Sequence, residues 1–224
     1  DFVNIKNSID YTWKDDEFET PGISKDLQKI LKKINNLDKL SYLDVGCGNG
    51  SVTKKISFFF NNATGIDLSQ AGIEQAKKKN KENINFLHTS LEETIEQKKK
   101  FDFVSVIEVI EHQYDPFLFI EQLSKVTEDN GYVVISTPYH GYLKNLLISL
   151  LGKMDRHFTA LWKHGHIKFF SVKTLKDLIL GSETIYEKNI SKPNFEIVKI
   201  YFSGRFFPLS HSMIFLLRKK SPIL

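Results

Sequence analysis

The first residues that could do chemistry form a glycine-rich stretch, residues 46–50, with the sequence Gly-Cys-Gly-Asn-Gly. The stretch directly follows an apolar run at residues 40–45. Glycines permit positive φ angles and carry no Cβ, so a ligand can lie against such a backbone. Cys47 reads as a small filler residue, because nothing near it in the sequence would activate a thiol. The pattern predicts a ligand-binding loop between a strand and a helix.

An acidic residue follows at the end of the next apolar run. Asp67 is the last but one residue of the run at residues 63–68, where a carboxylate can accept two hydrogen bonds from a ribose diol. A single glycine-rich turn could be no more than a tight connection, but the loop together with Asp67 favours a nucleotide-containing ligand. An NAD-type dehydrogenase stays an alternative, although its Gly-x-Gly-x-x-Gly pattern needs glycine at position 51, where this chain has Ser51.

Two glutamates and a histidine follow the fourth apolar run: Glu108, Glu111 and His112. If this segment is helical, Glu108 falls on one face with Glu111 or His112. The three side chains could bind a divalent cation, or His112 could act as a general base, since an imidazole pKa of about 6.5 suits neutral pH. A structural interpretation also stays open, in which His112 orients the loop before Pro116 and Glu108 is solvated.

Residues 139–165 carry an apolar stripe at helical spacing with basic residues around it. The stripe consists of Leu143, Leu146, Leu147, Leu150, Leu151 and Met154, and the basic residues are Lys144, Lys153, Arg156 and Lys163. One interpretation is a lid packed on the core. The other is an amphipathic element, residues 143–163, that rests on a membrane or grips a lipid-like substrate. His166 follows closely, in the string His-Ile-Lys-Phe-Phe-Ser.

Strands and helices alternate between these residues. The apolar runs predict strands over residues 40–45, 63–68, 84–88, 101–107 and 132–137. Helical periods and caps predict a first helix capped by Ser24, then helices over 51–60, 70–80 (capped by Ser69), 116–126 (ended by Asn130-Gly131) and 172–180 (capped by Ser171). Such alternation implies right-handed crossovers and a parallel sheet. Two late runs, 195–202 and 213–219, have a short connection and therefore form an antiparallel edge pair.

The composition is that of one globular domain, with 41% hydrophobic and 26% charged residues. The net charge of +4 is small and the lysine runs read as solvated, so we expect no nucleic-acid partner. A single cysteine fits a reducing compartment. No apolar run reaches the roughly 18 residues of a membrane span and no signal peptide is visible. We therefore expect a cytoplasmic chain with, at most, peripheral membrane contact through residues 143–163; the sequence gives no oligomeric state.

The loop, Asp67 and the alternating pattern resemble those of the class I S-adenosylmethionine-dependent methyltransferases over residues 40–137. The matching stretches are residues 43–50, 65–69, 101–104 and 130–132. The resemblance implies a Rossmann-like α/β fold: a seven-stranded, mostly parallel sheet with an antiparallel last strand, helices on both faces and a helical lid insertion. It implies a single methyltransferase domain, divided into an N-terminal helical cap (1–38), a cofactor-binding core (39–138), a lid (139–170) and a C-terminal helix and strand pair (171–224).

The same resemblance implies S-adenosyl-L-methionine as cofactor, with its methionine part over the glycine loop. Asp67 would hold the ribose hydroxyls and Leu68 would pack on the adenine. Ser90 stands where the family often has an aspartate that faces the adenine amine. The implied cofactor-binding residues are Asp44, Gly46, Cys47, Gly48, Gly50, Asp67, Leu68, Ser90, Leu91 and Ile107.

The string Glu-x-x-Glu-His resembles a narrower group, the ubiquinone-biosynthesis O-methyltransferases. It implies Mg²⁺ held by Glu108, Glu111 and His112, which would lower the pKa of an acceptor hydroxyl. We expect Glu108, His112 and His166 to be catalytic. The expected reaction is methyl transfer to a small-molecule acceptor, at a hydroxyl oxygen of an apolar, aromatic or glycan-type metabolite. A nonenzymatic lipid- or partner-binding module on the same fold is the other alternative.

Overall fold

A seven-stranded sheet forms the centre of the chain, with the strand order β3-β2-β1-β4-β5-β7-β6. The computed structural model describes residues 20, 22–79, 84–158, 160–162, 165–181, 193–204 and 207–221. The strands are β1 (Ser41–Val45), β2 (Asn62–Asp67), β3 (Ile84–His88), β4 (Phe101–Ile107), β5 (Thr127–Pro138), β6 (Phe195–Ser203) and β7 (Ser212–Lys219). Strands β1 to β5 are parallel, whereas β7 is antiparallel to both of its neighbours. The predicted mostly parallel sheet with an antiparallel last strand is confirmed.

The two late strands form an antiparallel pair at one edge of the sheet, as predicted, and within that pair β7 lies on the inner side, between β5 and β6. Residues 213–217 of β7 are all apolar and buried. A strand that is apolar on both faces belongs in the interior of a sheet. Strand β6 is the edge, and its Val198 is exposed.

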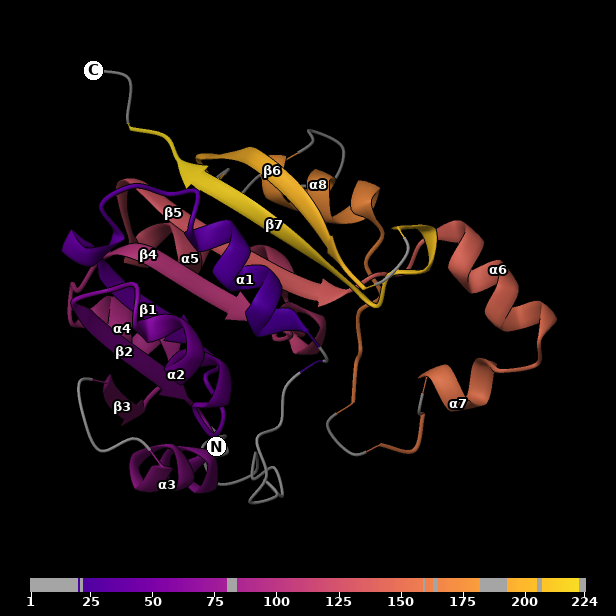
Figure 1. Ribbon diagram of the computed structural model, residues 1–224, viewed down its shortest axis with the longest axis horizontal. Coiled ribbons are helices and arrows are strands. Elements are labelled where there is room, and N and C mark those ends of the chain that lie inside the picture. Colours follow the sequence, from indigo (N-terminus) through magenta and orange to yellow (C-terminus); the bar gives the residue numbers. More distant parts are fainter. Residues whose placement is uncertain are drawn as a thin grey trace, which may run out of the picture.

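Helices cover both faces of this sheet (Figure 1). On one face α1 (Ile23–Leu31) contacts α2 (Ser51–Ser57), and on the other α5 (Pro116–Val126) contacts both α4 (Leu91–Glu96) and α8 (Val172–Leu180). Helix α3 (Gln70–Lys79) packs beside β2 and β3, and a short 3₁₀ helix, η2 (Leu37–Lys39), precedes β1. The helical crossovers allow the first five strands to run parallel.

Alternation along each strand builds a hydrophobic core on both faces. In β1, Leu43 belongs to the cluster under α5 and α8, whereas Tyr42 belongs to the cluster under α1 and α2. Strand β4 divides in the same way between Val104 and Phe103. Burial on both faces explains why these strands read as almost continuous apolar runs.

Several predicted element bounds match the structure, and others differ for local reasons. Ser171 caps α8 as predicted, and the Ser69 hydroxyl accepts a hydrogen bond from a backbone amide in the first turn of α3. Helix α1 begins one residue before Ser24, which is buried in its first turn, and Gly22 occupies the N-cap position with φ 83°. Helix α2 ends at Ser57 rather than at residue 60.

Strand β5 begins directly after α5, so the prediction that Asn130 and Gly131 end that helix is wrong. Asn130 has φ 63°, and the pairing with β4 shifts register between Phe101 and Phe103. Asn130 and Gly131 therefore lie in a bulge within strand β5. Helix α4 was not predicted, although residues 90–93 carry the Ser-x-x-Glu pattern of a capping box.

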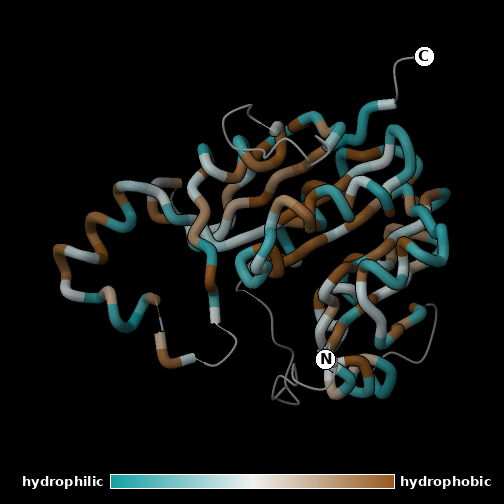
Figure 2. Tube along the Cα trace, turned by 180° about the vertical axis from the view of Figure 1, so that it is seen from behind, coloured by the Kyte–Doolittle hydropathy of each residue, from teal (hydrophilic) through white to brown (hydrophobic). Residues whose placement is uncertain are grey.

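The segment predicted as a lid is helical but stands away from the body of the fold (Figures 1 and 2). It contains α6 (Tyr142–Leu150) and α7 (Met154–Phe158), and neither helix has a buried residue. Leu150 is 73% exposed and Leu151 is 64% exposed. The interpretation of a lid packed on the core is therefore wrong for the apolar stripe. Lys163, which flanks the stripe, lies outside the described residues.

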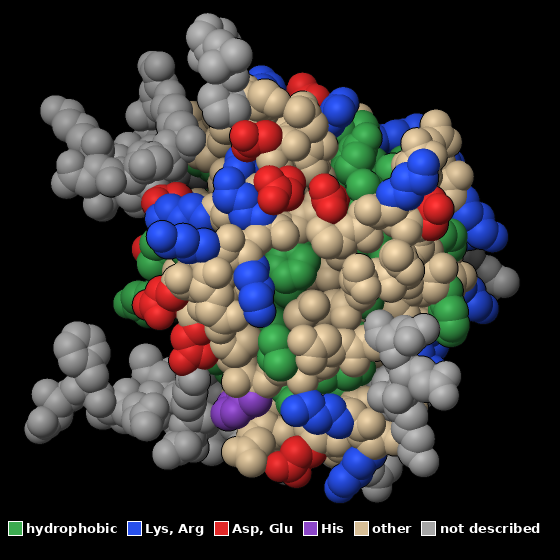
Figure 3. All heavy atoms as spheres, turned by 90° about the vertical axis from the view of Figure 1, so that its left-hand side faces the viewer, with side chains coloured by type: hydrophobic (Ala, Val, Ile, Leu, Met, Phe, Trp, Pro, Cys, Tyr) green, Lys and Arg blue, Asp and Glu red, His purple; other side chains and the backbone are tan. Residues whose placement is uncertain are grey.

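The surface in Figure 3 carries acidic and basic side chains interspersed with apolar ones. Among the residues that the structure describes, no helix is long and apolar enough to span a membrane. The expectation of no nucleic-acid partner stays a prediction.

Asp44 joins three elements beneath the glycine loop. Its carboxylate accepts hydrogen bonds from Thr53 Oγ1 on α2 at 2.5 Å and from Ser105 Oγ on β4 at 2.6 Å. Only 2% of the residue is exposed. Burial raises the pKa of Asp44 to about 6, although the bonds from Ser105 and Thr53 oppose that shift.

Replacing Asp44 by Asn should therefore change how stability depends on pH. The unfolded chain releases this proton at a pKa of about 3.9, so the folded chain holds it more tightly and ionisation costs stability as the pH rises. Between about pH 4 and 6, the free energy of unfolding of the wild type should fall relative to Asp44→Asn by up to about 3 kcal/mol, measured by urea denaturation. Parallel pH curves for the two proteins would contradict this account.

Candidate active site

The glycine loop turns at the carboxyl end of β1. The amides of Gly46 and Cys47 both donate to the carbonyl of Ile66 on β2, at 2.8 and 3.0 Å. Gly46, Gly48 and Gly50 have φ angles of 74°, 54° and 75°. This left-handed region is costly for residues with a Cβ. The predicted loop between a strand and a helix is confirmed in position.

Steric contacts add a second reason for two of these glycines. A Cβ on Gly46 would lie 2.5 Å from Val109 Cγ2, and one on Gly50 would lie 2.8 Å from Phe86 Cζ. The buried Cys47 packs with Phe86 in a small cluster. Burial raises the pKa of the Cys47 thiol well above its usual range. This environment agrees with the interpretation of Cys47 as a filler residue.

Asp67 connects the glycine loop to the start of α3. One carboxylate oxygen accepts from the Gly48 amide at 2.7 Å, and the other accepts from the Ser69 amide at 2.7 Å. Burial raises the pKa of Asp67, while these two backbone bonds oppose the shift. Asp67 is half-buried, so solvent still reaches part of the residue. A carboxylate thus lies at the loop, on the strand where the sequence places a ribose-binding acid.

The remaining predicted cofactor residues lie around the same sheet edge but have structural roles of their own. The Ser90 hydroxyl accepts from the Glu93 amide at 3.1 Å and caps α4. Leu91 is buried in the main core, and Ile107 packs against the core on the opposite face. Leu68 is half-buried, and its carbonyl lies 3.0 Å from His88 Nε2. Direct cofactor contacts of Asp44, Ser90 and Leu91 stay predictions.

Glu108 has an unusual backbone at the carboxyl end of β4. Its φ is 55°, and its amide donates to the Ser136 carbonyl and hydroxyl oxygens, both at 3.1 Å. Ser136 Oγ in turn donates to Glu108 Oε1 at 2.8 Å. Burial raises the pKa of Glu108 to about 7, against hydrogen bonds from Ser136, Ser212 and Thr20 and the charge of Lys144. The carboxyl group is therefore poised to exchange a proton near neutral pH.

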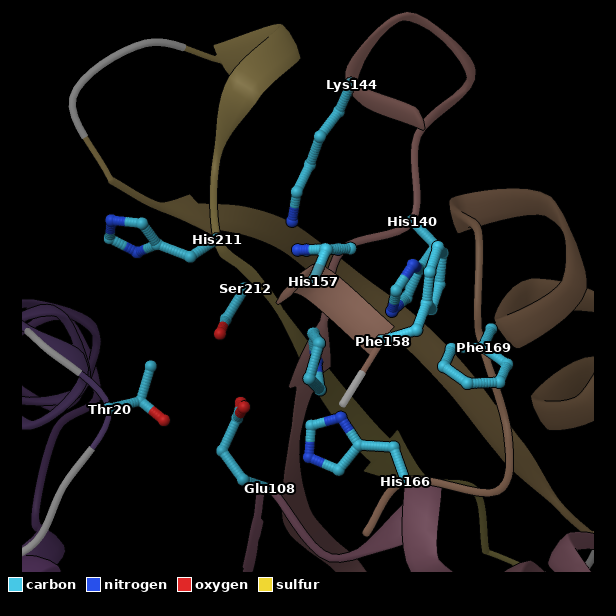
Figure 4. A pocket seen from close by; sticks show the side chains of 11 residues that line it. Thr20, Glu108, His140, Lys144, His157, Phe158, His166, Phe169, His211 and Ser212 are labelled. Carbon is cyan, nitrogen blue, oxygen red and sulfur yellow. The ribbon is translucent and has the colours of Figure 1, made fainter. Parts of the chain in front are cut away.

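Glu108 faces a cavity of about 230 Å³ at this edge of the sheet (Figure 4). The cavity is lined by Thr20, Glu108, Pro138, His140, Lys144, His157, Phe158, His166, Phe169, His211 and Ser212. His140 stacks on Phe158 and meets Phe169 edge-on. Neither ring nitrogen of His140 has a hydrogen-bond partner among the described residues. Burial lowers the pKa of His140 to about 4, and the nearby charge of Lys144 adds to this.

The three predicted metal ligands do not come together. The group that does consists of Glu111, His112 and His166, whose nearest ligand atoms all lie within 4.8 Å of one another. Residues 110–112 form a 3₁₀ helix, η3 (Ile110–His112), and the left-handed turn at Glu108 directs its carboxylate elsewhere. Burial, followed by the charge of Glu108, raises the pKa of Glu111 well above its usual range. His166 belongs to this group and also lines the cavity, and burial lowers its pKa to about 4. Its expected catalytic role stays a prediction.

This donor set does not fit Mg²⁺. Mg²⁺ prefers six oxygen ligands, whereas the set offers one carboxylate and two imidazoles. Such a set is typical of Zn²⁺ and neighbouring transition metals.

Sequence reasoning missed several residues beside Glu108. Ser136 lies near the carboxyl end of β5, and Ser212 is the first residue of the antiparallel strand β7. Both residues therefore lie at the same edge of the sheet as Glu108. Hydroxyl residues carry no periodic signal, and the position of β7 beside β5 was not predicted. Lys144 and His157 come from α6 and α7, and their side chains point into the cavity. His164 lies outside the described residues.

Substituting Gly46 by Ala should impair both folding and the loop. Gly152→Ala is the matched control, because Gly152 also has a positive φ, 62°, but a Cβ there would meet nothing within 4 Å. We expect Gly152→Ala to cost about 1 kcal/mol of stability from the backbone alone. Gly46→Ala should cost more, by denaturant titration, and should also weaken nucleotide binding. Equal effects of the two substitutions would contradict the steric argument.

Comparisons with known proteins show the family to which this chain belongs. Residues 16–181 match the model of a family described as "Methyltransferase domain". The chain is 41% identical over 170 residues to a ubiquinone biosynthesis O-methyltransferase of Rickettsia akari, covering 70% of this chain and 65% of the relative. It is 39% identical over 161 residues to the same enzyme of Rickettsia canadensis, covering 68% of this chain and 66% of the relative. The chain thus spans just under two thirds of the length of these relatives.

A solved structure shares the fold at low identity. Magnesium protoporphyrin IX methyltransferase from Synechocystis, with bound SAH, aligns with a TM-score of 0.61 and 18% identity over 89% of this chain and 84% of that one. Together with the strand order and the glycine loop, the family match is decisive, and this chain belongs to the methyltransferase domain family.

Proposed function

We propose that this chain transfers a methyl group from S-adenosylmethionine to a hydroxyl oxygen of a small molecule. The observation that carries the proposal is the shared sheet edge: the glycine loop and Asp67 follow β1 and β2, and Glu108 follows β4 beside a cavity. Ligands of open α/β sheets bind at the carboxyl ends of the strands. Family membership and the similarity to O-methyltransferases support the same reaction.

The glycine loop and Asp67 would hold the cofactor. Positive φ angles at the three glycines shape the loop whose backbone would carry the methionine part of the cofactor, and the Asp67 carboxylate offers its oxygens to the ribose hydroxyls. S-adenosylmethionine supplies a methyl group activated by its sulfonium. The chain supplies the rest by fixing the position of the acceptor and removing its proton.

Glu108 is the best placed of the proposed catalytic residues to take the acceptor proton. Its carboxyl group faces the cavity, and a pKa of about 7 leaves a large ionised fraction at neutral pH. A general base works best when its pKa lies near the working pH. His166 lines the same cavity, and His112 lies behind it, with ring centroids 4.9 Å apart. Both would orient the acceptor, and the reaction would proceed without Mg²⁺, because one carboxylate and two imidazoles do not fit that ion.

The cavity favours an aromatic acceptor of modest size. Its walls include Phe158, Phe169 and the ring of His140, which lie against one another. Its volume of about 230 Å³ is a little below the range of about 300–1,000 Å³ that is common for drug-sized ligands. Aromatic rings pack well between such walls. The glycan-type acceptor is less well supported by these walls.

We also propose that α6 and α7 make a peripheral contact with a membrane. The apolar stripe is exposed, with Leu143 and Leu146 at 46% and 41%, and Lys153 and Arg156 are exposed beside it. A helix with an apolar face and basic flanks binds anionic lipid surfaces. An acceptor that partitions into lipid would then reach the cavity from the membrane side, because Lys144 and His157 of these helices line it.

The alternatives have less support. Ser51 stands where a dinucleotide-binding pattern needs glycine, and its hydroxyl donates to Asn49 Oδ1 at 2.7 Å. A nonenzymatic module would not need a carboxylate of raised pKa beside a cavity. The intact loop and Asp67 also argue against a decayed site.

Asp67→Ala should weaken binding of S-adenosylhomocysteine by roughly tenfold or more in isothermal titration, since hydrogen bonds to a charged group are worth about 1.5–3 kcal/mol. Asp102→Ala is the matched control. Asp102 is a half-buried acid that accepts from Ser41 at the opposite end of β1, so its loss should leave the affinity unchanged. Failure of the wild type to bind, or binding of NAD in its place, would overturn the proposal.

Glu108→Gln should lower kcat by roughly 100-fold or more, the usual contribution of a general base. The assay follows the methyl group of labelled S-adenosylmethionine into hydroxylated aromatic compounds. Affinity for S-adenosylhomocysteine should stay at the wild-type value, because Glu108 lies on the acceptor side. Unchanged turnover would remove Glu108 from the proposed catalytic group.

Negative charge introduced on the apolar stripe should abolish vesicle binding. We expect the wild type to sediment with vesicles of anionic phospholipid and the double variant Leu143→Glu, Leu150→Glu to stay in the supernatant. Phe58→Glu is the control, since Phe58 is 82% exposed in the body of the fold. Equal sedimentation of all three proteins would exclude the stripe as the contact.

A further inference from the structure

We infer that Glu111, His112 and His166 form a binding site for a borderline divalent transition-metal ion of the Zn²⁺ class, from which Glu108 is excluded. The sequence pattern predicts a different set of ligands and a different metal. The inference does not depend on methyl transfer, since it concerns only these side chains and the ion.

The carboxylate of Glu111 is the strongest observation. The residue is 0% exposed, and neither carboxylate oxygen has a hydrogen-bond partner among the described residues. His166 Nε2 lies 3.8 Å from its Oε1. A buried polar group without partners is costly and calls for an explanation, of which a bound ion is one. The carboxylate lies in the one group of potential ligands found in the described part of the chain.

The geometry is close to that of a bound ion. The three nearest ligand atoms lie within 4.8 Å of one another. In a tetrahedral arrangement, bonds of about 2.0–2.2 Å from Zn²⁺ to nitrogen and oxygen place ligand atoms roughly 3.3–3.6 Å apart. The most distant pair of ligand atoms therefore needs to close by at most about 1.5 Å.

The ligand types select the class of ion. Two imidazoles with one carboxylate form a recurrent site for Zn²⁺ and its first-row neighbours. Mg²⁺ binds oxygen ligands and retains waters, so it gains little from two ring nitrogens. Three protein ligands leave a fourth position of a tetrahedral ion free for water or an acceptor oxygen, and His166 lines the cavity where that oxygen would lie.

The backbone already holds the distant ligand in place. The amides of Ile167 and Lys168 both donate to the carbonyl of Glu111 at 3.0 Å. These bonds attach the segment after α7 to η3 immediately beside His166. Trp162 packs edge-on against the rings of both His112 and His166. An ion bound here would join the return of the lid segment to the core.

The test titrates Zn²⁺ into the full chain after chelator treatment, by isothermal calorimetry. We expect one Zn²⁺ per chain, and binding weakened by more than roughly 100-fold in Glu111→Gln and in His166→Gln. Co²⁺ in place of Zn²⁺ should give the visible absorption of a four-coordinate site, and both variants should lose it. Excess Mg²⁺ should leave the Zn²⁺ affinity unchanged.

Two variants serve as matched controls and should keep the wild-type affinity for Zn²⁺. Glu108→Gln removes the glutamate that the sequence pattern includes, and His157→Gln removes a cavity histidine outside the cluster. If Glu111→Gln fails to fold, His166→Gln decides, because His166 is partly exposed and its loss removes no buried charge. Wild-type Zn²⁺ affinity in His166→Gln, loss of affinity in Glu108→Gln, or displacement of Zn²⁺ by Mg²⁺ would each overturn the inference. Retained binding of S-adenosylhomocysteine in every variant separates this outcome from a failure of the proposed function.

Discussion

The pair of hydrogen bonds that Asp67 accepts is the interaction on which the rest of the site depends. Its carboxylate holds the amides of Gly48 and Ser69, and so fixes the glycine loop after β1 against the start of α3 after β2. The loop in turn lies against Val109, directly after Glu108. The cofactor side and the acceptor side of the site are therefore built on the same strand ends, and a shift in one moves the other.

Much of this fold can be predicted from sequence because its strands are buried on both faces. Strands β3 and β4 and helices α5 and α8 have the predicted bounds, since apolar periodicity agrees with the cap at Ser171 and with Pro116 in the first turn of α5. Placement of β7 between β5 and β6 could not be predicted, because a short connection fixes antiparallel pairing but not which strand meets β5. Helix α4 was missed because its apolar residues are few, although its capping box was readable.

The candidate site also contains parts that could be predicted from the sequence and parts that could not. The loop and Asp67 are local features of strand ends, and the structure places them as predicted. The Glu-x-x-Glu-His string was interpreted with helical spacing, which a φ of 55° at Glu108 and a 3₁₀ turn at residues 110–112 break. The carboxylate of Glu108 therefore lies beside Ser136 at the cavity, whereas the carboxylate of Glu111 is buried beside His166. Neither a positive φ at glutamate nor the approach of a distant histidine leaves a periodic trace in the sequence.

For the apolar stripe, the helical pattern was predicted correctly, but the predicted packing of the stripe on the core was wrong. Helical spacing predicted α6, yet none of its residues is buried, and the helix stands away from the body of the fold (Figure 2). The most direct measurement of the central claim is a crystal structure of the chain with S-adenosylhomocysteine. The account predicts the ligand over residues 46–50, with its ribose hydroxyls on Asp67 and its sulfur directed toward the cavity of Glu108. A ligand bound elsewhere, or one whose ribose does not reach Asp67, would contradict it.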